Sequence, residues 1–251
     1  MMRDGPMKQN IYDNEEFFDY YINMRKNRSG LNEALEQPAF MSLVPDLKGK
    51  RVLDLGCGFG ENCKTYEAMG ASEVIGLDIS EKMLTIAKEK FSGDRIKYIH
   101  SSLEEMNFDD NYFDVILSSL TFHYVKDFNE SICRLSKYIR KDGILLFSIE
   151  HPIATAKFVK QGWVKDESGN KDHWIMDNYQ EEGLRYHKWV LDDVIKYHRT
   201  ISTTLNTLID NGFNILQVDE PVALESEELK KESLKEERRR PPFLIVKCRK
   251  E

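Results

Sequence analysis

The stretch from Arg51 to Asn62 constrains the fold of this chain more than any other. It reads RVLDLGCGFGEN, an apolar run that ends in a glycine-rich turn, and a second apolar run, VIGL, leads to Asp78. A strand, a glycine turn that opens a helix and a second strand with a carboxylate at its tip make up half of a nucleotide-cofactor site in a parallel α/β sheet. The glycines let backbone approach a ligand, and the carboxylate can accept both hydroxyls of a ribose.

The charges around this turn indicate which cofactor it binds. The glycines follow the pattern Gly56-x-Gly58-x-Gly60. Glu61 stands where a dinucleotide fingerprint has its third glycine, and its carboxylate repels the pyrophosphate that a helix N-terminus otherwise attracts. Because Asp54 adds negative charge just before the turn, the site favours a cationic ligand without phosphate. S-adenosylmethionine has an ammonium, a sulfonium and a ribose, and it is the predicted cofactor.

Four further blocks follow the glycine turn in a fixed order. They are DISEKMLTIAKEK at 78–90, SSLEEMNF at 101–108, YFDVILSSLTFHYV at 112–125 and IRKDGILLFSIEHP at 139–152. With the turn, these blocks resemble the class I S-adenosylmethionine-dependent methyltransferases, in the type 11 branch related to the ubiquinone and menaquinone biosynthesis enzymes. Shorter strings (EHP, DNY, KYHRT and RPPF) are similar to a bacterial branch of that family, and this likeness implies no particular methyl acceptor.

Alternating apolar runs and helical patterns predict an α/β fold. Strands are expected at 51–55, 73–77, 95–99, 113–118 and 143–149, with a helix after each of the first four, including 80–90 and 127–140. Ser80 is the expected N-cap of the first of these helices, Asp127 or Asn129 that of the second, and Gly143 is expected to end the second helix and begin the fifth strand. The resemblance implies a Rossmann-like sheet of seven mostly parallel strands in the order 3-2-1-4-5-7-6, with helices on both faces.

The segments outside this alternation are expected to close the site. Residues 1–251 are predicted to form one domain, in which 1–46 are an N-terminal helical cap and 150–191 an aromatic-rich insertion. That insertion lacks a clean period, which favours a packed lid, with a hairpin near 168–170; extra β-structure or a dimer contact are the alternatives. Residues 190–213 are expected to be one amphipathic helix, residues 213–221 and 241–250 the last two strands, and the charged run between those strands a solvated helix.

Cofactor contacts are expected from the residues around the first two strands and the loops beyond them. The adenine is expected between Ile79 and the loop at Ser102 and Leu103, with Ser101 where many relatives have Asp. The resemblance places Arg25 where a basic residue of relatives often meets the methionine carboxylate; a surface charge on an amphipathic helix is the alternative. The full predicted set is Arg25, Asp54, Gly56, Cys57, Gly58, Gly60, Asp78, Ile79, Met83, Ser101, Ser102, Leu103 and Ser118.

Methyl transfer needs a general base only if the nucleophile starts protonated. The predicted candidates, which follow strands four and five, are His123, Glu150 and His151; for His123 a packed core histidine is the alternative. Acceptor contacts are expected from Tyr124, Trp174, Tyr179 and His198. If no base is used, placing the acceptor beside the methyl group supplies much of the rate.

Composition narrows the class of partner. The net charge of -7 and the pI near 5.5 argue against nucleic acid, so the expected partner is a small-molecule acceptor. No signal peptide or membrane span is apparent, and the four cysteines lack metal-ligand spacing. A cytoplasmic monomer or homodimer without metal is expected. A S-adenosylmethionine-binding module without transferase activity is an open alternative, and a nicotinamide oxidoreductase is disfavoured by the charges at the turn.

Overall fold

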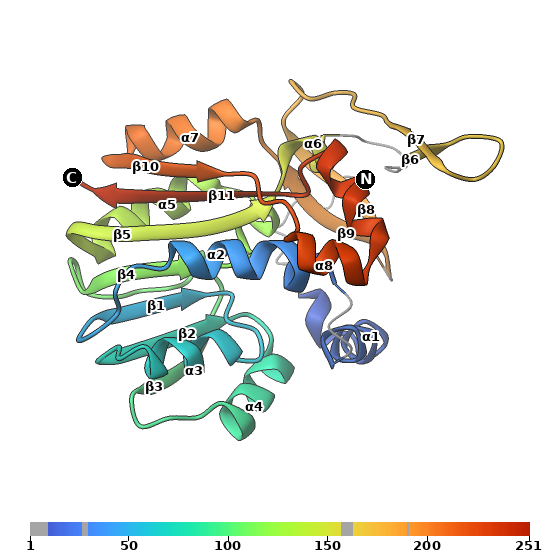
Figure 1. The fold of residues 1–251 in the computed structure, drawn as a ribbon. Helices are drawn as coiled ribbons and strands as arrows, with labels where there is room; N and C mark the ends of the chain where they lie inside the picture. Colours follow the sequence, from blue (N-terminus) through green and yellow to red (C-terminus); the bar gives the residue numbers. More distant parts are fainter. Residues whose placement is uncertain (1–9, 27–29, 157–162, 190) are drawn as a thin grey trace, which may run out of the picture.

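A seven-stranded sheet runs through the structure, a computed structural model that describes residues 10–26, 30–156, 163–189 and 191–251 (Figure 1). Its strands lie in the order β3-β2-β1-β4-β5-β11-β10. When the hairpin strands β6 to β9 are left out of the numbering, this is the predicted order 3-2-1-4-5-7-6. β11 runs antiparallel to both neighbours and the other pairs are parallel. The strands are β1 (Arg51–Leu55), β2 (Glu73–Asp78), β3 (Ile96–His100), β4 (Phe113–Ser118), β5 (Ile139–Glu150), β10 (Phe213–Asp219) and β11 (Phe243–Lys250).

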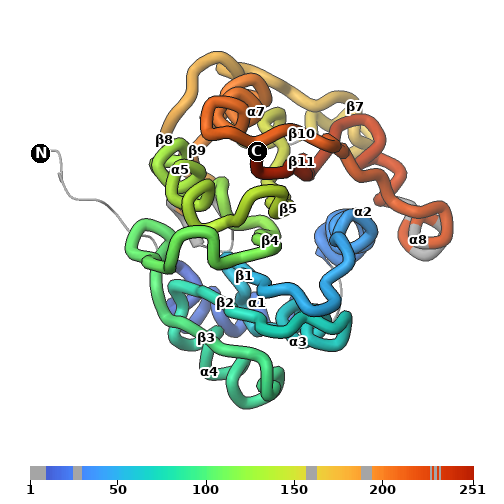
Figure 2. Tube along the Cα trace, turned by 90° about the vertical axis from the view of Figure 1, so that its left-hand side faces the viewer, coloured from blue at the N-terminus to red at the C-terminus, as the bar shows by residue number. Residues whose placement is uncertain are grey.

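Helices cover both faces of this sheet (Figure 2). Successive strand residues point to opposite faces, so each central strand contributes to two apolar layers. One layer joins Leu53 and Leu77 to the helices α5 and α7, and the other joins Val52 and Val74 to α2, α3 and α4. These helices are α2 (Gln37–Leu43), α3 (Glu61–Ala68), α4 (Glu81–Lys90), α5 (Phe128–Tyr138) and α7 (Ile201–Asp210).

Two predicted helix caps are confirmed, and other boundaries differ from expectation. Ser80 Oγ accepts the N–H of Met83 at 3.1 Å, and Asp127 caps α5 by accepting the N–H of Glu130 at 2.8 Å. α5 ends at Tyr138, and β5 begins at the next residue by pairing with β4, so the prediction that Gly143 ends the helix is wrong. The left-handed turn within this strand falls instead at Asp142, with φ of 61°. Turns, and no helix, connect β3 to β4.

The insertion after β5 contains two hairpins. β6 (Trp163–Lys165) and β7 (Lys171–Trp174) form the first, which confirms the hairpin expected near 168–170, and its turn is held by Asp166, whose carboxylate accepts two backbone N–H groups. β8 (Gly183–Trp189) and β9 (Leu191–His198) form the second. The predicted helix over 190–213 is therefore wrong over residues 191–200, and α7 begins at Ile201. Pairing with β8 decides the backbone there, and tertiary pairing overrides a helical pattern.

The remaining elements are short. They are η1 (Ile11–Asp13), α1 (Glu15–Lys26), the π-helical η2 (Asn32–Glu36), η3 (Phe122–Tyr124), α6 (Pro152–Thr155), α8 (Glu225–Lys230) and η4 (Glu232–Arg239). α8 and η4 replace the single solvated helix predicted between the last two strands. That prediction is wrong because Leu234 is 2% exposed and packs against Leu35, Ala223 and Phe243.

Candidate active site

The glycine turn between β1 and α3 presents one open backbone position. Gly56, Gly58 and Gly60 all have positive φ, at 70°, 52° and 81°. A Cβ on Gly56 would lie 2.1 Å from Thr121 Oγ1, and one on Gly60 would lie 2.2 Å from the hydroxyl of Tyr98. A Cβ on Gly58 would meet nothing within 4 Å. Gly58 is therefore where the backbone faces space that a ligand can use.

Asp78 lies directly beside this open position. Its carboxylate accepts the N–H of Gly58 at 2.8 Å through Oδ2 and the N–H of Ser80 at 2.8 Å through Oδ1. Burial raises the pKa of Asp78, and these backbone hydrogen bonds oppose the rise. Each carboxylate oxygen can accept a second hydrogen bond, so both oxygens can still receive hydroxyl groups of a ribose.

Asp54 forms a buried acidic centre beneath the turn. It is 2% exposed, and the thiol of Cys63 donates to its Oδ2 at 3.3 Å. Burial raises the pKa of Asp54 to about 7, the bond from Cys63 opposes this, and the charge of Asp78 adds to it. Cys57 is also buried, and both thiols are free. Asp54 is thus a carboxyl group whose charge near neutral pH depends on the charge of a ligand bound at the turn.

This environment predicts that cofactor affinity depends on pH. A cation near Asp54 lowers its pKa, so binding of S-adenosylmethionine is expected to release a proton from Asp54 around pH 7. Affinity should therefore fall as the pH is lowered from about 7.5 to about 5.5, by about tenfold per pH unit at most. Calorimetry in buffers of different ionisation enthalpy measures both the affinity and the proton release. Asp54→Asn is expected to remove the pH dependence; an equally steep dependence in that variant would assign it to another group.

The residues expected around the adenine surround the end of β2. The N–H of Ser101 donates to the Asp78 carbonyl at 3.0 Å, and Ser102 and Leu103 are buried in the following turn. Ile79 is half-buried and Met83, on the first turn of α4, is buried. Ser118 is fully buried and donates to the carbonyl of Leu55, and the side chain of Arg25 lies outside the described part of the chain.

The N-terminal segment lies over this edge of the sheet. The amide of Asn10 donates to the carbonyl of Ile79 at 3.0 Å, and Asp13 accepts the hydroxyl of Ser80 at 2.6 Å. The ring of Tyr21 lies 5.9 Å from that of Phe59, inside the glycine turn. A second group of aromatic side chains, which includes Tyr12, Tyr21 and Tyr124, packs around Ile11, Phe17 and Val194 of β9. The N-terminal segment therefore joins the cofactor side of the edge to the insertion.

A charged pair lies beyond Tyr124, at the ends of β5 and β9. Lys196 Nζ lies 2.6 Å from Glu150 Oε1. Burial raises the pKa of Glu150, but Lys196 outweighs this and holds it at about 2. Burial lowers the pKa of His123 to about 3, and its Nδ1 accepts the N–H of Glu150 at 3.4 Å. Glu150 is thus a stable carboxylate, and His123 a neutral ring whose proton lies on Nε2.

The other predicted histidines serve the packing of the fold. His151 is fully buried; its Nδ1 accepts the N–H of Ile153 at 3.1 Å and its Nε2 lies 2.8 Å from Glu220. His198 is also fully buried and lies 2.9 Å from both Thr155 Oγ1 and the carbonyl of Tyr179. Since both nitrogens of each ring are engaged, neither is free to take a proton from an acceptor.

Two of the three aromatic residues predicted to contact an acceptor, Tyr179 and Trp174, make other contacts in the fold. The hydroxyl of Tyr179 accepts the N–H of Ile201 at 3.1 Å, so it holds the start of α7. Trp174 lies on the first hairpin, with the guanidinium of Arg240 at 4.1 Å from its ring centre. Among the described residues, Tyr124 is the predicted acceptor residue that packs against the N-terminal segment.

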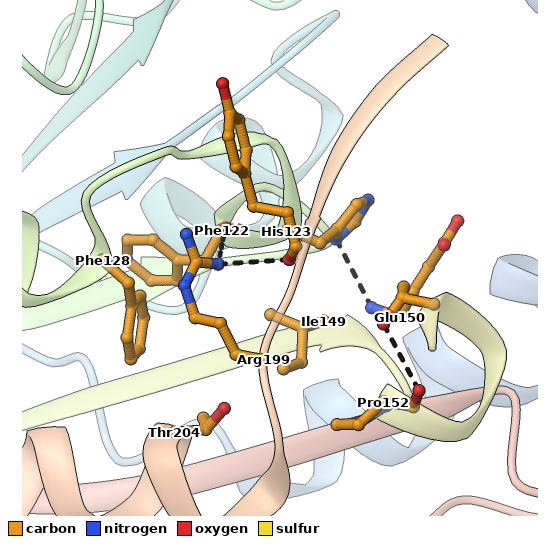
Figure 3. A pocket seen from close by; sticks show the side chains of 10 residues that line it. Phe122, His123, Phe128, Ile149, Glu150, Pro152, Arg199 and Thr204 are labelled. Carbon is orange, nitrogen blue, oxygen red and sulfur yellow. Dashed lines mark hydrogen bonds between the residues drawn. The ribbon is translucent and has the colours of Figure 1, made fainter. Parts of the chain in front are cut away.

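A small pocket lies on the α5 and α7 side of β5 (Figure 3). None of the predicted cofactor residues lines it. Arg199 reaches into it from the connection between β9 and α7 and donates to the carbonyl groups of Phe122, Val125 and Lys126, which fixes the loop after β4. The lining residues are Phe122, His123, Phe128, Ile149, Glu150, Pro152, Thr155, Tyr197, Arg199 and Thr204. Glu150 and His123 line this pocket, whereas no residue of the glycine turn is among its lining residues.

Sequence reasoning missed three polar residues at this edge. Glu36 is fully buried and accepts hydroxyls of Ser119 at 2.9 Å and Ser148 at 2.5 Å, which ties the ends of β4 and β5 together. Lys196 was missed because its strand has a helical pattern, and Arg240 because it belongs to a charged run. The alternation of Val194, Lys196 and His198, all buried, was the available signal for a strand.

Comparison with known proteins agrees with this geometry. A methyltransferase domain family model matches residues 53–147. A Haemophilus influenzae protein described as uncharacterized is 38% identical over 250 residues, which cover 97% of this chain and 98% of that one. A S-adenosylmethionine dependent methyltransferase from Mesorhizobium loti is 39% identical with a TM-score of 0.81, covering 86% of this chain and 97% of its own. A provisionally assigned one from Listeria monocytogenes is 38% identical with the same TM-score, covering 86% and 96%.

The sheet topology, the glycine turn and the similar proteins together identify a Rossmann-like methyltransferase. The chain belongs to the S-adenosylmethionine-dependent methyltransferases, and its cofactor is S-adenosylmethionine. The open backbone at Gly58, the buried carboxylate of Asp78 and the acidic Asp54 fit a ligand with a ribose and a cationic end. Within the described residues, no helix has the length and apolar character needed to cross a membrane, and no group of three metal-ligating side chains comes together.

Proposed function

We propose that this enzyme transfers a methyl group by in-line displacement to a small-molecule acceptor held at the carboxyl ends of β4 and β5. The observation that carries the proposal is the open position at Gly58 beside Asp78. Tyr12 and Tyr124 pack in one aromatic cluster at this edge of the sheet, and the Glu150–Lys196 pair lies at the end of β5. The cofactor is thereby assigned to the Gly58 side and the acceptor to the side of Glu150 and Lys196, with the transferred methyl group where the two meet. Detection of S-adenosylhomocysteine release from a mixed library of acids, amines and phenols tests the activity.

Each predicted cofactor residue has a role in this proposal. Asp78 accepts the ribose hydroxyls, and the turn of Gly56, Cys57, Gly58 and Gly60 brings the open backbone at Gly58 close to the ligand. Asp54 favours the cationic end. Ile79, Met83 and the loop of Ser101, Ser102 and Leu103 enclose the adenine. Ser118 supports the end of β4, and Arg25 is proposed to meet the methionine carboxylate.

The side chains near the acceptor are suited to positioning and poorly suited to removing a proton. S-adenosylmethionine supplies a methyl group that its sulfonium has already activated, so placing the acceptor atom in line supplies much of the rate. His123 has a pKa of about 3 and carries its proton on the outer nitrogen, while Glu150 has a pKa of about 2 and is paired with Lys196. We therefore propose an acceptor that reaches the site already nucleophilic.

If the acceptor needs no general base, replacing His123 is expected to have only a small effect on turnover. His123→Asn keeps an acceptor near the Nδ1 position and removes the imidazole, and kcat at saturating cofactor is expected to change by less than about threefold. The kcat of the wild type should also stay flat from about pH 6 to about pH 9. A general base contributes ~10²- to 10⁴-fold, so a loss of that size, with an intact fold, would make His123 the base. Turnover with an acceptor found in the library screen provides both measurements.

A further inference from the structure

Arg240 lies at the acceptor side of the sheet edge with part of its hydrogen-bonding capacity unused. It immediately precedes the two prolines that lead into β11, and Phe243 of that strand pairs with Glu150. The N–H of His151 donates to the Pro242 carbonyl at 2.9 Å, so the segment is fixed beside the end of β5. The charge of Glu150 acts on the guanidinium of Arg240. Arg240 therefore borders the region assigned to the acceptor.

The guanidinium is held in one orientation. It stacks on Trp174, with 4.1 Å from Cζ to the ring centre, and its Nη2 lies 3.1 Å from Glu237 Oε2. Trp174 is itself fixed by Trp163, whose ring lies 5.7 Å away, edge to face. Stacking and an ion pair orient the planar fork without using all of its N–H groups. The side chain of Arg240 remains 13% exposed.

Three buried donors in this cluster have no acceptor among the described residues. They are Nε of Arg240 and the indole Nε1 atoms of Trp163 and Trp174. Leaving a buried donor without a partner is energetically costly, and native structures contain few of them. The ring of Trp163 also carries other cations, because Arg239 and Lys171 lie 4.7 Å and 5.0 Å from its centre. Three unused donors in a cationic cluster are the complement of an anion with several acceptor oxygens.

We propose that Arg240, with the indole groups of Trp163 and Trp174, recognises a carboxylate on the methyl acceptor. The inference rests on the proposed function, because it places this anion site next to the transferred methyl group. Nε and one Nη of a guanidinium can donate side by side to the two oxygens of a carboxylate. A phosphate dianion fits less well, since Glu237 and Glu150 lie close by and repel a second negative charge.

Tryptophan fluorescence tests the site without a known acceptor. The protein has three tryptophans, two of them in the cluster, so the wild type saturated with S-adenosylhomocysteine is titrated with benzoate, benzamide and inorganic phosphate. Benzoate is expected to bind at least about tenfold more tightly than either alternative, as a charge-assisted bidentate pair requires. Equal binding of benzoate and benzamide, or preference for phosphate, would overturn the proposal.

Variants assign the binding to one arginine. Arg240→Gln is expected to weaken the binding of benzoate at least about tenfold. Arg240→Lys is expected to recover only part of that loss, because an ammonium cannot donate two parallel hydrogen bonds to a carboxylate as a planar guanidinium does. Arg238→Gln is the matched control: it removes the same charge two residues away, from a side chain that is 46% exposed and paired with Glu228. If Arg240→Gln and Arg238→Gln bind benzoate like the wild type, the anion lies elsewhere and the proposal is wrong.

A separate measurement keeps this proposal distinct from the proposed function. Acceptors that release S-adenosylhomocysteine are compared with their amide counterparts, and acids are expected to be preferred in the wild type and not in Arg240→Gln. Turnover without this preference overturns the carboxylate site alone. A protein that binds the cofactor and benzoate but methylates no acceptor overturns the proposed function and leaves the anion site standing.

Discussion

Gly58→Val is expected to abolish binding of S-adenosylmethionine, with a loss of at least about a hundredfold, or about 2.7 kcal/mol. A Cβ at this position has nothing within 4 Å, so the new side chain would fill the space that is assigned to the cofactor. Isothermal calorimetry measures the affinity, and circular dichroism with thermal melting checks the fold. Unchanged affinity would place the cofactor away from this turn.

The backbone strain of this substitution needs its own control. A branched residue at positive φ costs roughly 1 to 2 kcal/mol wherever it occurs. Gly49 has φ of 71°, and a Cβ there also meets nothing within 4 Å, but it precedes β1 at the opposite edge of the sheet. Gly49→Val should therefore lose stability and keep its affinity. Gly56→Val is unsuitable as a probe because its side chain would collide with Thr121.

Asp78→Ala is expected to weaken the cofactor by about tenfold to a hundredfold, because a charged group that accepts hydrogen bonds contributes roughly 1.5 to 3 kcal/mol. The substitution also leaves the N–H groups of Gly58 and Ser80 without their acceptor, so a lower melting temperature is expected as well. Calorimetry and thermal melting separate the two effects.

Asp13→Ala is the matched control for this loss. Asp13, in η1, also places a carboxylate against the start of α4. It accepts hydrogen bonds from the hydroxyl of Ser80, the N–H of Lys82 and the amide of Asn10. Asp78, by contrast, accepts a hydrogen bond from the glycine turn itself. The variant is expected to destabilise the protein with a much smaller effect on affinity. If Asp78→Ala binds the cofactor as the wild type does, Asp78 does not hold the ribose.

The sequence by itself determined the features that depend on neighbouring residues. The glycine turn with positive φ, the carboxylate at the tip of β2 and the caps at Ser80 and Asp127 all follow from residues a few positions apart. The order of the seven sheet strands followed from the family resemblance, since the alternation of strands and helices leaves few ways to wind a parallel sheet. These parts of the fold were predicted correctly.

Only the tertiary structure decided the chemistry of the proposed acceptor side. Residues 191–198 have a pattern that fits a helix, and they form a strand because β8 lies alongside and supplies their backbone partners. Glu150 meets Lys196, 46 residues away, and that contact makes it a carboxylate of low pKa instead of a base. His151 and His198 have the residue type of a catalytic base and the surroundings of a packed core.

The same distinction explains why Arg240 could not be assigned from its sequence neighbours. In the run RRR the three side chains are equivalent by composition, yet they differ in exposure and only Arg240 stacks on Trp174. Hydrogen-bond partners, burial and pKa are properties of surroundings that the fold assembles from distant segments. Local patterns therefore predicted the turn to which the cofactor is assigned, whereas the proposed acceptor side depended on which distant side chains the packing brought together.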